Sequence, residues 1–346
     1  MGWTGSLTAS SAVGSEMTFS PDTSTMGEYT VSTFTAPRKG IYRFDLKGSG
    51  GATGAKSKGG YSVSGAGKYE RASGGIGGKT TGYLLLEKGE TVHVGCGGTC
   101  SAAFVSSSTG TTLANVKKAN LYFVAGAGGQ GGTYVDDINS TGYNCYATAG
   151  GNGGGTSGKA GASYSSNVGG GGGTQSAGGV AGGDSSDAKG SNGAYGTGGS
   201  NDKAYAQYGG GAYLGIGGRG GDGYYGGGSG QAYVADNAAR SNGGGGGSGY
   251  VKTASFVHGE TEYKSSTSEG SGAAAGKKGS IVVTYYARAE LPVTFNGTKL
   301  EKIIFNGTEI TSLIFNGTKL FFERMKKGAL AWSAQMMTDN KANVPV

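Results

Sequence analysis

The stretch GGRGGDGYYGGGSG, residues 217–230, decides the fold, because nine of its fourteen residues are glycine. Three interpretations are open. It could be a flexible linker, a calcium-binding β-roll loop, since Gly217–Tyr224 largely matches G-G-x-G-x-D-x-U, or an ordered structure built from glycine. β-Rolls need tandem copies, and this pattern occurs once. Disordered linkers are poor in aromatic residues, whereas Tyr224 and Tyr225 lie mid-stretch. We therefore expect an ordered, metal-free structure with many contacts to other glycine runs.

The overall composition argues against one conventional hydrophobic core. The chain has 346 residues, of which 78 are glycine and only 35% are hydrophobic. Globular domains have about 7% glycine and are about 45–50% apolar. The net charge is +7, but the basic residues are scattered and form no basic stripe with interleaved aromatic residues. We expect no nucleic-acid partner, and the charge indicates solubility or weak attraction to anionic surfaces.

Alternating apolar residues predict a β-sandwich made of residues 34–125 and 279–288. In the segment 40–47, apolar and charged residues alternate, as in a half-buried strand. A strand–turn–strand unit is predicted over 83–94 and another strand over 120–125, where β-branched and aromatic residues are enriched. An all-β fold follows from these patterns.

Residues 126–278 are predicted to be a long glycine-rich insert in this sandwich; about a third of residues 121–250 are glycine. The insert leaves one predicted strand and rejoins another, and closing such a loop costs entropy that grows only logarithmically with its length. Its glycine runs fit a bundle of polyglycine II helices, extended threefold helices of the polyproline II kind without internal hydrogen bonds. Neighbouring helices would then satisfy each other's backbone groups. Collagen is excluded by the missing G-X-Y period and by only 4 prolines.

Residues 289–322 contain a ten-residue repeat, VTFNGTKLEK, IIFNGTEITS and LIFNGTKLFF. Asn-Gly between alternating apolar residues predicts a type I′ β-hairpin in each unit, and three equal units predict stacked hairpins. The flanking ends differ: residues 1–33 are a polar segment without periodicity, and residues 323–346 form a tail with one helix-compatible stretch.

The cysteines and histidines do not form a recognisable site in the sequence. Cys96, Cys100 and Cys145 are too few for a disulfide scaffold, and only His93 and His258 could join them around a metal. We expect reduced thiols without a functional role and no metal site; whether Cys96 and Cys100 are bonded stays open.

The sequence also lacks a credible catalytic motif. Ser73–Thr80 resembles a phosphate-binding loop, but Tyr83–Leu86 then reads as a strand, whereas such a loop must open a helix. We expect no enzymatic activity, no catalytic residue and no cofactor. No segment reaches the roughly 18 apolar residues of a membrane span, and the N-terminus has no secretory signal pattern.

The order of the segments resembles a known family of domains. FTAPRKGIYRFDLKGSGGATG, LYFVAGAGGQGG, GGDGYYGGGSG and GSIVVTYY resemble the glycine-rich domain of anaplastic lymphoma kinase and leukocyte tyrosine kinase receptors. This resemblance, over roughly residues 30–287, implies a TNF-like (jelly-roll) sandwich with polyglycine II helices, and by analogy a homotrimer. Glycine-helix bundles also form the receptor-recognising part of T-even-type phage tip adhesins. The FNGT repeats resemble the C-terminal ends of phage and prophage minor structural and tail proteins.

Together these features predict a non-enzymatic adhesin of a phage or phage-like particle, located in the virion at a tail tip, fibre or baseplate. Its partners would be a host cell-surface polysaccharide or protein and other virion proteins, without membrane insertion. The alternative is a structural virion component whose bundle contacts other subunits. We expect the receptor to contact turn residues of the insert, namely Tyr143, Tyr146, Tyr195, Tyr205, Tyr208, Tyr213, Asp222, Tyr224, Tyr225 and Tyr233.

Overall fold

The structure is a computed structural model whose backbone forms two compact units, Met1–Ala287 and Arg288–Val346. The predicted sandwich and glycine-rich insert both lie in the first unit. The residues described are 2–55, 57–58, 61–62, 68–136, 146–164, 168–183, 190–201, 203–208, 211–235, 238–258, 261–289, 294–295, 298–299, 304–305, 308–309, 312–315 and 318–321.

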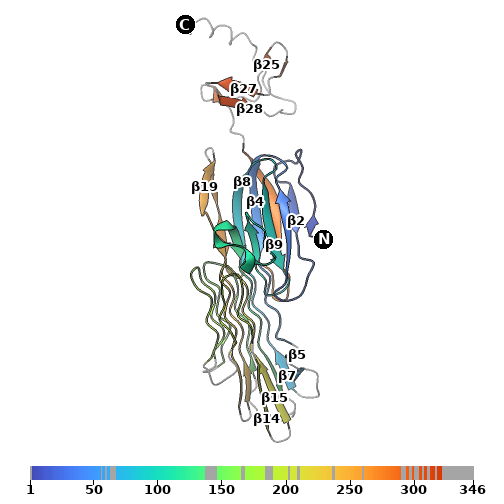
Figure 1. The fold of residues 1–346 in the computed structure, drawn as a ribbon, viewed down its shortest axis with the longest axis vertical. Coiled ribbons are helices and arrows are strands. Elements are labelled where there is room, and N and C mark those ends of the chain that lie inside the picture. Colours follow the sequence, from blue (N-terminus) through green and yellow to red (C-terminus); the bar gives the residue numbers. More distant parts are fainter. Residues whose placement is uncertain are drawn as a thin grey trace. The chain divides into compact units, whose positions relative to one another are not determined.

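Two antiparallel sheets make up one end of the first unit (Figure 1), which confirms the all-β prediction. The six-stranded sheet has the order β1 (Trp3–Thr4), β2 (Glu16–Phe19), β22 (Ser280–Arg288), β4 (Gly40–Lys47), β8 (Lys79–Leu86) and β21 (Ser266–Ser268). The five-stranded sheet has the order β18 (Tyr250–Val251), β11 (Leu121–Ala125), β10 (Ala103–Ser106), β9 (Thr91–Gly97) and β3 (Tyr29–Thr35).

One apolar core joins the two sheets. On β4 the alternation seen in the sequence places Tyr42, Phe44 and Leu46 inside, fully buried. The Phe44 ring centroid lies 5.9 Å from that of Phe34 on β3 and 6.2 Å from that of Phe123 on β11, so these rings pack across the two sheets. Burial of each such ring contributes roughly 1.5–3 kcal/mol.

The N-terminal segment differs from its predicted role as a polar region separate from the sandwich. Strand β2 pairs with β22, and Phe19 is fully buried in the core between the sheets. Trp3 packs its ring 5.1 Å from that of Phe19. The few apolar residues of this segment are therefore sufficient to add two strands to the six-stranded sheet, although they show no extended periodicity.

Extended glycine-rich segments run from this end of the unit to the other (Figure 1). Their hydrogen bonds are made between segments and repeat every three residues around the central segment 242–249. The backbone N–H groups of Asn242 and Gly245, three residues apart, donate to the carbonyl oxygens of Gln231 and Gly228. Gly244 and Gly247 donate to Gln130 and Ala127, and their carbonyl oxygens accept from Gly151 and Gly154. The carbonyl oxygens of Gly243 and Gly246 accept from Gly170 and Gly173. The central segment is thus bonded on several sides at once, unlike a strand in a sheet.

Glycine is required here because the backbones are too close for a side chain. A Cβ at Gly245 would lie 2.0 Å from the carbonyl oxygen of Gly171, and one at Gly247 would lie 2.1 Å from that of Asp222. Residues 217–230 bond to other glycine runs: Gly220 donates to Gly199 and Gly221 donates to Gly245. The expected order of this stretch, and its contacts with other glycine runs, are confirmed.

The far end of the glycine segments carries two small sheets. One has the order β14 (Lys203–Tyr208), β15 (Gly211–Ile216), β12 (Thr133–Asp136) and β7 (Lys68–Arg71), and the other β13 (Tyr146–Ala147), β17 (Ala238–Ser241) and β16 (Ala232–Ala235). The insert therefore contains strands as well as glycine segments. Further pairs are β5 (Ser57–Lys58) with β6 (Tyr61–Ser62) and β19 (Ser255–His258) with β20 (Thr261–Lys264), and short 3-10 helices cover Leu113–Asn115 and Lys118–Asn120.

In the second unit, each FNGT repeat forms a hairpin as predicted. The pairs are β23 (Thr294–Phe295) with β24 (Thr298–Lys299), β25 (Ile304–Phe305) with β26 (Thr308–Glu309), and β27 (Ser312–Phe315) with β28 (Thr318–Phe321). The Phe of each repeat pairs with its Thr, leaving the Asn-Gly dipeptide between the strands. Stacking of the hairpins stays a prediction, and residues 323–346 lie outside the described residues.

We predict that Gly245→Ala destabilises the first unit by about 3 kcal/mol, because the new methyl group would push packed backbones apart. Gly276→Ala is the control. Its φ is +73° and nothing lies within 4 Å of a Cβ there, so it should cost only about 1–2 kcal/mol of backbone strain. Thermal and denaturant unfolding measure the stability loss of each variant. Equal losses for the two variants would contradict close packing around Gly245.

Candidate functional site

Three of the tyrosines predicted to contact a receptor form a box of rings. The Tyr195, Tyr224 and Tyr225 rings lie nearly perpendicular to one another, at 89°, 78° and 89°, with centroids 5.4–6.2 Å apart. All three side chains are partly exposed. The turn after Asp222 brings Tyr224 and Tyr225 together, and Tyr195 joins them through a backbone bridge to Tyr225. We call these three residues the tyrosine box.

Two walls of the tyrosine box are held in place by the sandwich. The Tyr224 ring stacks on Tyr250 of β18, with centroids 4.2 Å apart and planes 10° apart. The Tyr195 hydroxyl donates a hydrogen bond of 2.6 Å to the Val116 carbonyl oxygen. Gly196, at φ +74°, turns the chain so closely against Ala114 that a Cβ would lie 2.5 Å away. The positions of the Tyr224 and Tyr195 rings are therefore set by contacts with Tyr250, Val116 and Ala114 and not by the three tyrosines alone.

Lys118 places its ammonium group in the tyrosine box. Its Nζ lies 4.9 Å from the centroid of Tyr195, 5.9 Å from that of Tyr224 and 4.4 Å from that of Tyr225. It also donates a 2.5 Å hydrogen bond to the Tyr225 hydroxyl. Aromatic faces attract cations at such distances. Sequence reasoning missed this contact, because Lys118 lies 77 positions from Tyr195, in the short 3-10 helix before β11.

Two of the predicted tyrosines belong to a second cluster near the far-end sheets. Tyr146 stacks on Tyr164, with centroids 3.9 Å apart, and the Arg240 guanidinium lies 5.3 Å from the Tyr164 ring and 5.8 Å from that of Tyr233. Tyr146 is 38% exposed. Sequence reasoning missed Tyr164 and Arg240 as members of this cluster, although Tyr164 lies in the glycine-rich insert like the others.

The structure does not describe the side chains of the other four predicted tyrosines. Tyr205 and Tyr208 are on β14 and Tyr213 is on β15, where the backbone alone is described. Tyr143 lies outside the described residues. Of the tyrosines predicted from the sequence, three therefore form the tyrosine box, two belong to the cluster around Tyr164 and Arg240, and three lie on β14 or β15.

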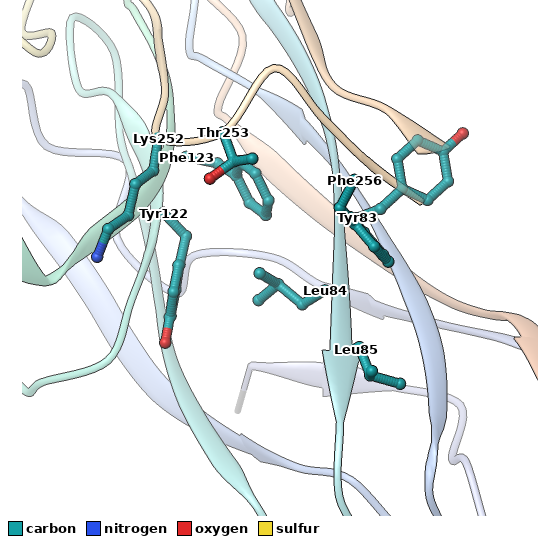
Figure 2. Close-up of a pocket in the computed structure, with 8 residues that line it drawn as sticks. All are labelled: Tyr83, Leu84, Leu85, Tyr122, Phe123, Lys252, Thr253 and Phe256. Atoms are coloured by element: carbon teal, nitrogen blue, oxygen red, sulfur yellow. The ribbon is translucent and has the colours of Figure 1, made fainter. Parts of the chain in front are cut away.

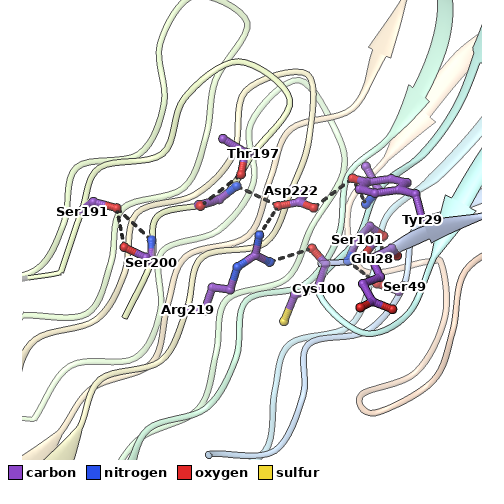
Figure 3. Close-up of polar contacts among 12 residues, drawn as sticks. Glu28, Tyr29, Ser49, Cys100, Ser101, Ser191, Thr197, Ser200, Arg219 and Asp222 are labelled. Atoms are coloured by element: carbon purple, nitrogen blue, oxygen red, sulfur yellow. Dashed lines mark hydrogen bonds and ion pairs between the residues drawn. The ribbon is translucent and has the colours of Figure 1, made fainter. Parts of the chain in front are cut away.

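The prediction that Asp222 is displayed at a turn is wrong, because its side chain is only 2% exposed. Figure 3 shows the polar contacts that surround it. Its carboxylate accepts hydrogen bonds from Arg219 Nη2 at 2.8 Å, from the Tyr29 hydroxyl at 2.9 Å and from the Gly198 backbone N–H at 2.8 Å. A buried carboxylate needs such partners. Asp222 thus joins two glycine segments to β3 and is structural.

The groups around Asp222 have shifted proton affinities. Burial raises the pKa of Tyr29 well above its usual value, and the neighbouring Asp222 charge adds to this. Burial acts to lower the pKa of Arg219, but the attraction of the Asp222 carboxylate outweighs burial and raises this pKa above its usual value. The guanidinium therefore stays charged. Cys100 supplies its carbonyl oxygen to the Asp222 N–H and holds φ +62° to do so. Cys96 and Cys100 are both free and buried.

An apolar groove of about 240 Å³ lies between β8 and β11 (Figure 2). The lining residues are Tyr83, Leu84, Leu85, Tyr122, Phe123, Lys252, Thr253 and Phe256. The Lys252 ammonium is bonded to the Ala119 carbonyl oxygen at 2.8 Å and lies 5.4 Å from the Tyr122 ring. The groove is therefore mainly a hydrophobic surface.

The other sequence motifs take structural places. Lys79 and Thr80 of the phosphate-loop-like segment lie on β8, and no helix follows them. His93 on β9 bonds Thr33 through Nδ1 at 3.2 Å. In the described part of the chain, no three His, Cys, Asp or Glu side chains are grouped to hold a metal, and no helix is long and apolar enough to span a membrane.

No protein-family model matches this sequence, and no curated protein is significantly similar to it.

We predict that Asp222→Asn destabilises the first unit by about 3–5 kcal/mol, because it leaves the buried Arg219 charge without its partner. The matched control is Glu87→Gln, which removes the exposed pair of Glu87 with Lys39, 2.7 Å apart; exposed pairs contribute little. Denaturant unfolding compares the two. An Asp222→Asn variant as stable as the control would contradict the structural role of this carboxylate.

Tyr195 should make the fold sensitive to alkaline pH. Burial, with smaller contributions from Tyr224, Tyr250 and Tyr225, raises its pKa from 10.0 to about 12. The unfolded chain loses this proton first, so the stabilisation is complete below pH 10 and is lost as the pH rises to about 12. Tyr195→Phe should therefore lose less stability over that range than the wild type. Unfolding midpoints measured from pH 10 to about 12 test this prediction, with Tyr233→Phe as the control variant. If the stability of Tyr195→Phe falls with pH as steeply as that of the wild type, the prediction is wrong.

Proposed function

We propose that this protein is a non-enzymatic adhesin of a phage or phage-like particle. It binds a host cell-surface polysaccharide or protein through partly exposed tyrosines carried by a polyglycine II helix bundle. It is part of the virion, at a tail tip, fibre or baseplate, and contacts other virion proteins. The TNF-like resemblance of its sandwich suggests a homotrimer.

The assignment of polyglycine II helices is part of this proposal. It is supported by the three-residue repeat of hydrogen bonds around residues 242–249, since a polyproline II-type helix has three residues per turn. It is supported also by bonding to several neighbouring segments at once, which a helix without internal hydrogen bonds requires.

One observation carries the binding role: partly exposed tyrosines lie in clusters beside the glycine segments, and those segments have almost no side chains of their own. Tyr146 is 38% exposed, and Tyr225 and Tyr233 are partly exposed. Tyrosine offers a large contact area at low entropic cost, as it does in antibody loops. A rigid base that presents tyrosines suits recognition better than it suits catalysis.

A second candidate function is a structural virion component, and the sandwich surface favours it. Leu85, Val257 and Tyr286 are 39%, 69% and 38% exposed, and Leu85 lines the apolar groove. Exposed apolar surface of this kind is typical of contacts with other proteins. In this case the sandwich would contact neighbouring particle subunits.

The test is binding of the purified, fluorescently labelled full chain to a panel of bacterial cells. We expect saturable binding to a subset of strains, reduced at least about tenfold when Tyr146, Tyr225 and Tyr233 are all replaced by Ala. Tyr286→Ala is the matched control, because Tyr286 has the same exposed fraction as Tyr146 but lies on the sandwich. Loss of binding in both variants, or in neither, would contradict the tyrosine surface. No binding to any strain, with the chain present in purified particles, would favour the structural role.

A further inference from the structure

The tyrosine box has the geometry of a cation site. Its three rings are mutually nearly perpendicular, and the ammonium of Lys118 lies within 6 Å of all three centroids. The face of an aromatic ring is negative, so three walls at right angles attract positive charge from three directions. Stacking of Tyr224 on Tyr250 and the Tyr195–Val116 hydrogen bond fix two of these walls in advance.

The cation in the tyrosine box is the ammonium of a flexible, exposed side chain. Lys118 is exposed and begins the short 3-10 helix Lys118–Asn120. Among the described residues, its ammonium donates one hydrogen bond, to the Tyr225 hydroxyl, and the lysine stem is flexible. An ammonium group in water is strongly hydrated, so it gains little by staying among half-exposed rings.

We propose that the tyrosine box is a binding site for a quaternary or fully methylated ammonium group, as in choline, and that Lys118 occupies it until such a ligand displaces it. A quaternary ammonium cannot donate hydrogen bonds to water, and aromatic boxes are the usual protein site for it. This inference deepens the proposed function and rests on it for its biological setting: a choline-bearing surface polymer would be the ligand class.

The experiment titrates the full chain with choline and follows the tyrosine signals by NMR. The neutral isostere 3,3-dimethylbutanol serves as the ligand control. We expect saturable choline binding, no binding of the isostere, and about tenfold tighter choline binding by Lys118→Gln, since the competing ammonium is removed. The neighbouring exposed Lys117→Gln should bind like the wild type. Tyr225→Ala in the Lys118→Gln background should weaken binding about fivefold through loss of one wall.

Several results would overturn the proposal. These are equal binding of choline and its neutral isostere, no choline binding by either the wild type or Lys118→Gln, or equal tightening by Lys117→Gln. Thermal unfolding of each variant shows whether it is folded. Should Lys118→Gln fail to fold, the wild-type titration against the isostere still decides the question.

The outcome is separable from that of the adhesin test. Choline binding without binding to any cell would support the ammonium site and reject the adhesin function. Cell binding by a protein that takes up no choline would support adhesion and overturn the ammonium site. If choline competes with cells for binding to the protein, that result would support both the ammonium site and the adhesin function.

Discussion

The close approach of one backbone to the next is the constraint on which the rest of this structure depends. Where a Cβ would stand at Gly245 or Gly247, a neighbouring carbonyl group already lies about 2 Å away. The segments are consequently held together by hydrogen bonds between peptide groups, with little side-chain packing. Such bonds are individually modest, about 1 kcal/mol net, but leaving them unmade in a buried position is costly. Residues other than glycine are therefore few within these segments, and several of those that do occur there, such as Asn242 and Ser248, are small or polar.

This restriction explains where the side chains with chemistry are found. Tyrosines lie at segment ends, where the chain turns or enters a strand, and there they meet rings from other segments. Among the described residues, the charged pair buried in this region, Arg219 with Asp222, is tolerated because Tyr29 and the Gly198 N–H complete the bonding of the carboxylate. That pair fixes residues 217–230 to the sandwich, and the same turn then delivers Tyr224 and Tyr225 to the tyrosine box.

The elements that depend on local sequence patterns could be predicted from the sequence. The alternation over 40–47 located the core face of β4, and the Asn-Gly dipeptides located the hairpins of the second unit. It failed where distant segments decide the outcome. Asp222 looks like a turn residue because glycine surrounds it, yet its partner Tyr29 is 193 positions away. Lys118 has no local feature that connects it to tyrosines, and the sparse apolar residues before Phe19 gave no period to follow.

The replacement of side-chain burial by peptide hydrogen bonds also changes how the two parts of the first unit respond to temperature. Exposing apolar surface raises the heat capacity on unfolding, and exposing peptide groups lowers it. The sandwich, with Phe44 and its neighbours, has the usual curved stability profile, and its hydrophobic stabilisation weakens on cooling. The glycine segments bury mainly peptide groups, so their heat-capacity change per residue is small and their stability profile has little curvature, without a marked loss on cooling. The tyrosines are thus carried by the part of the molecule whose rigidity is least affected by cold.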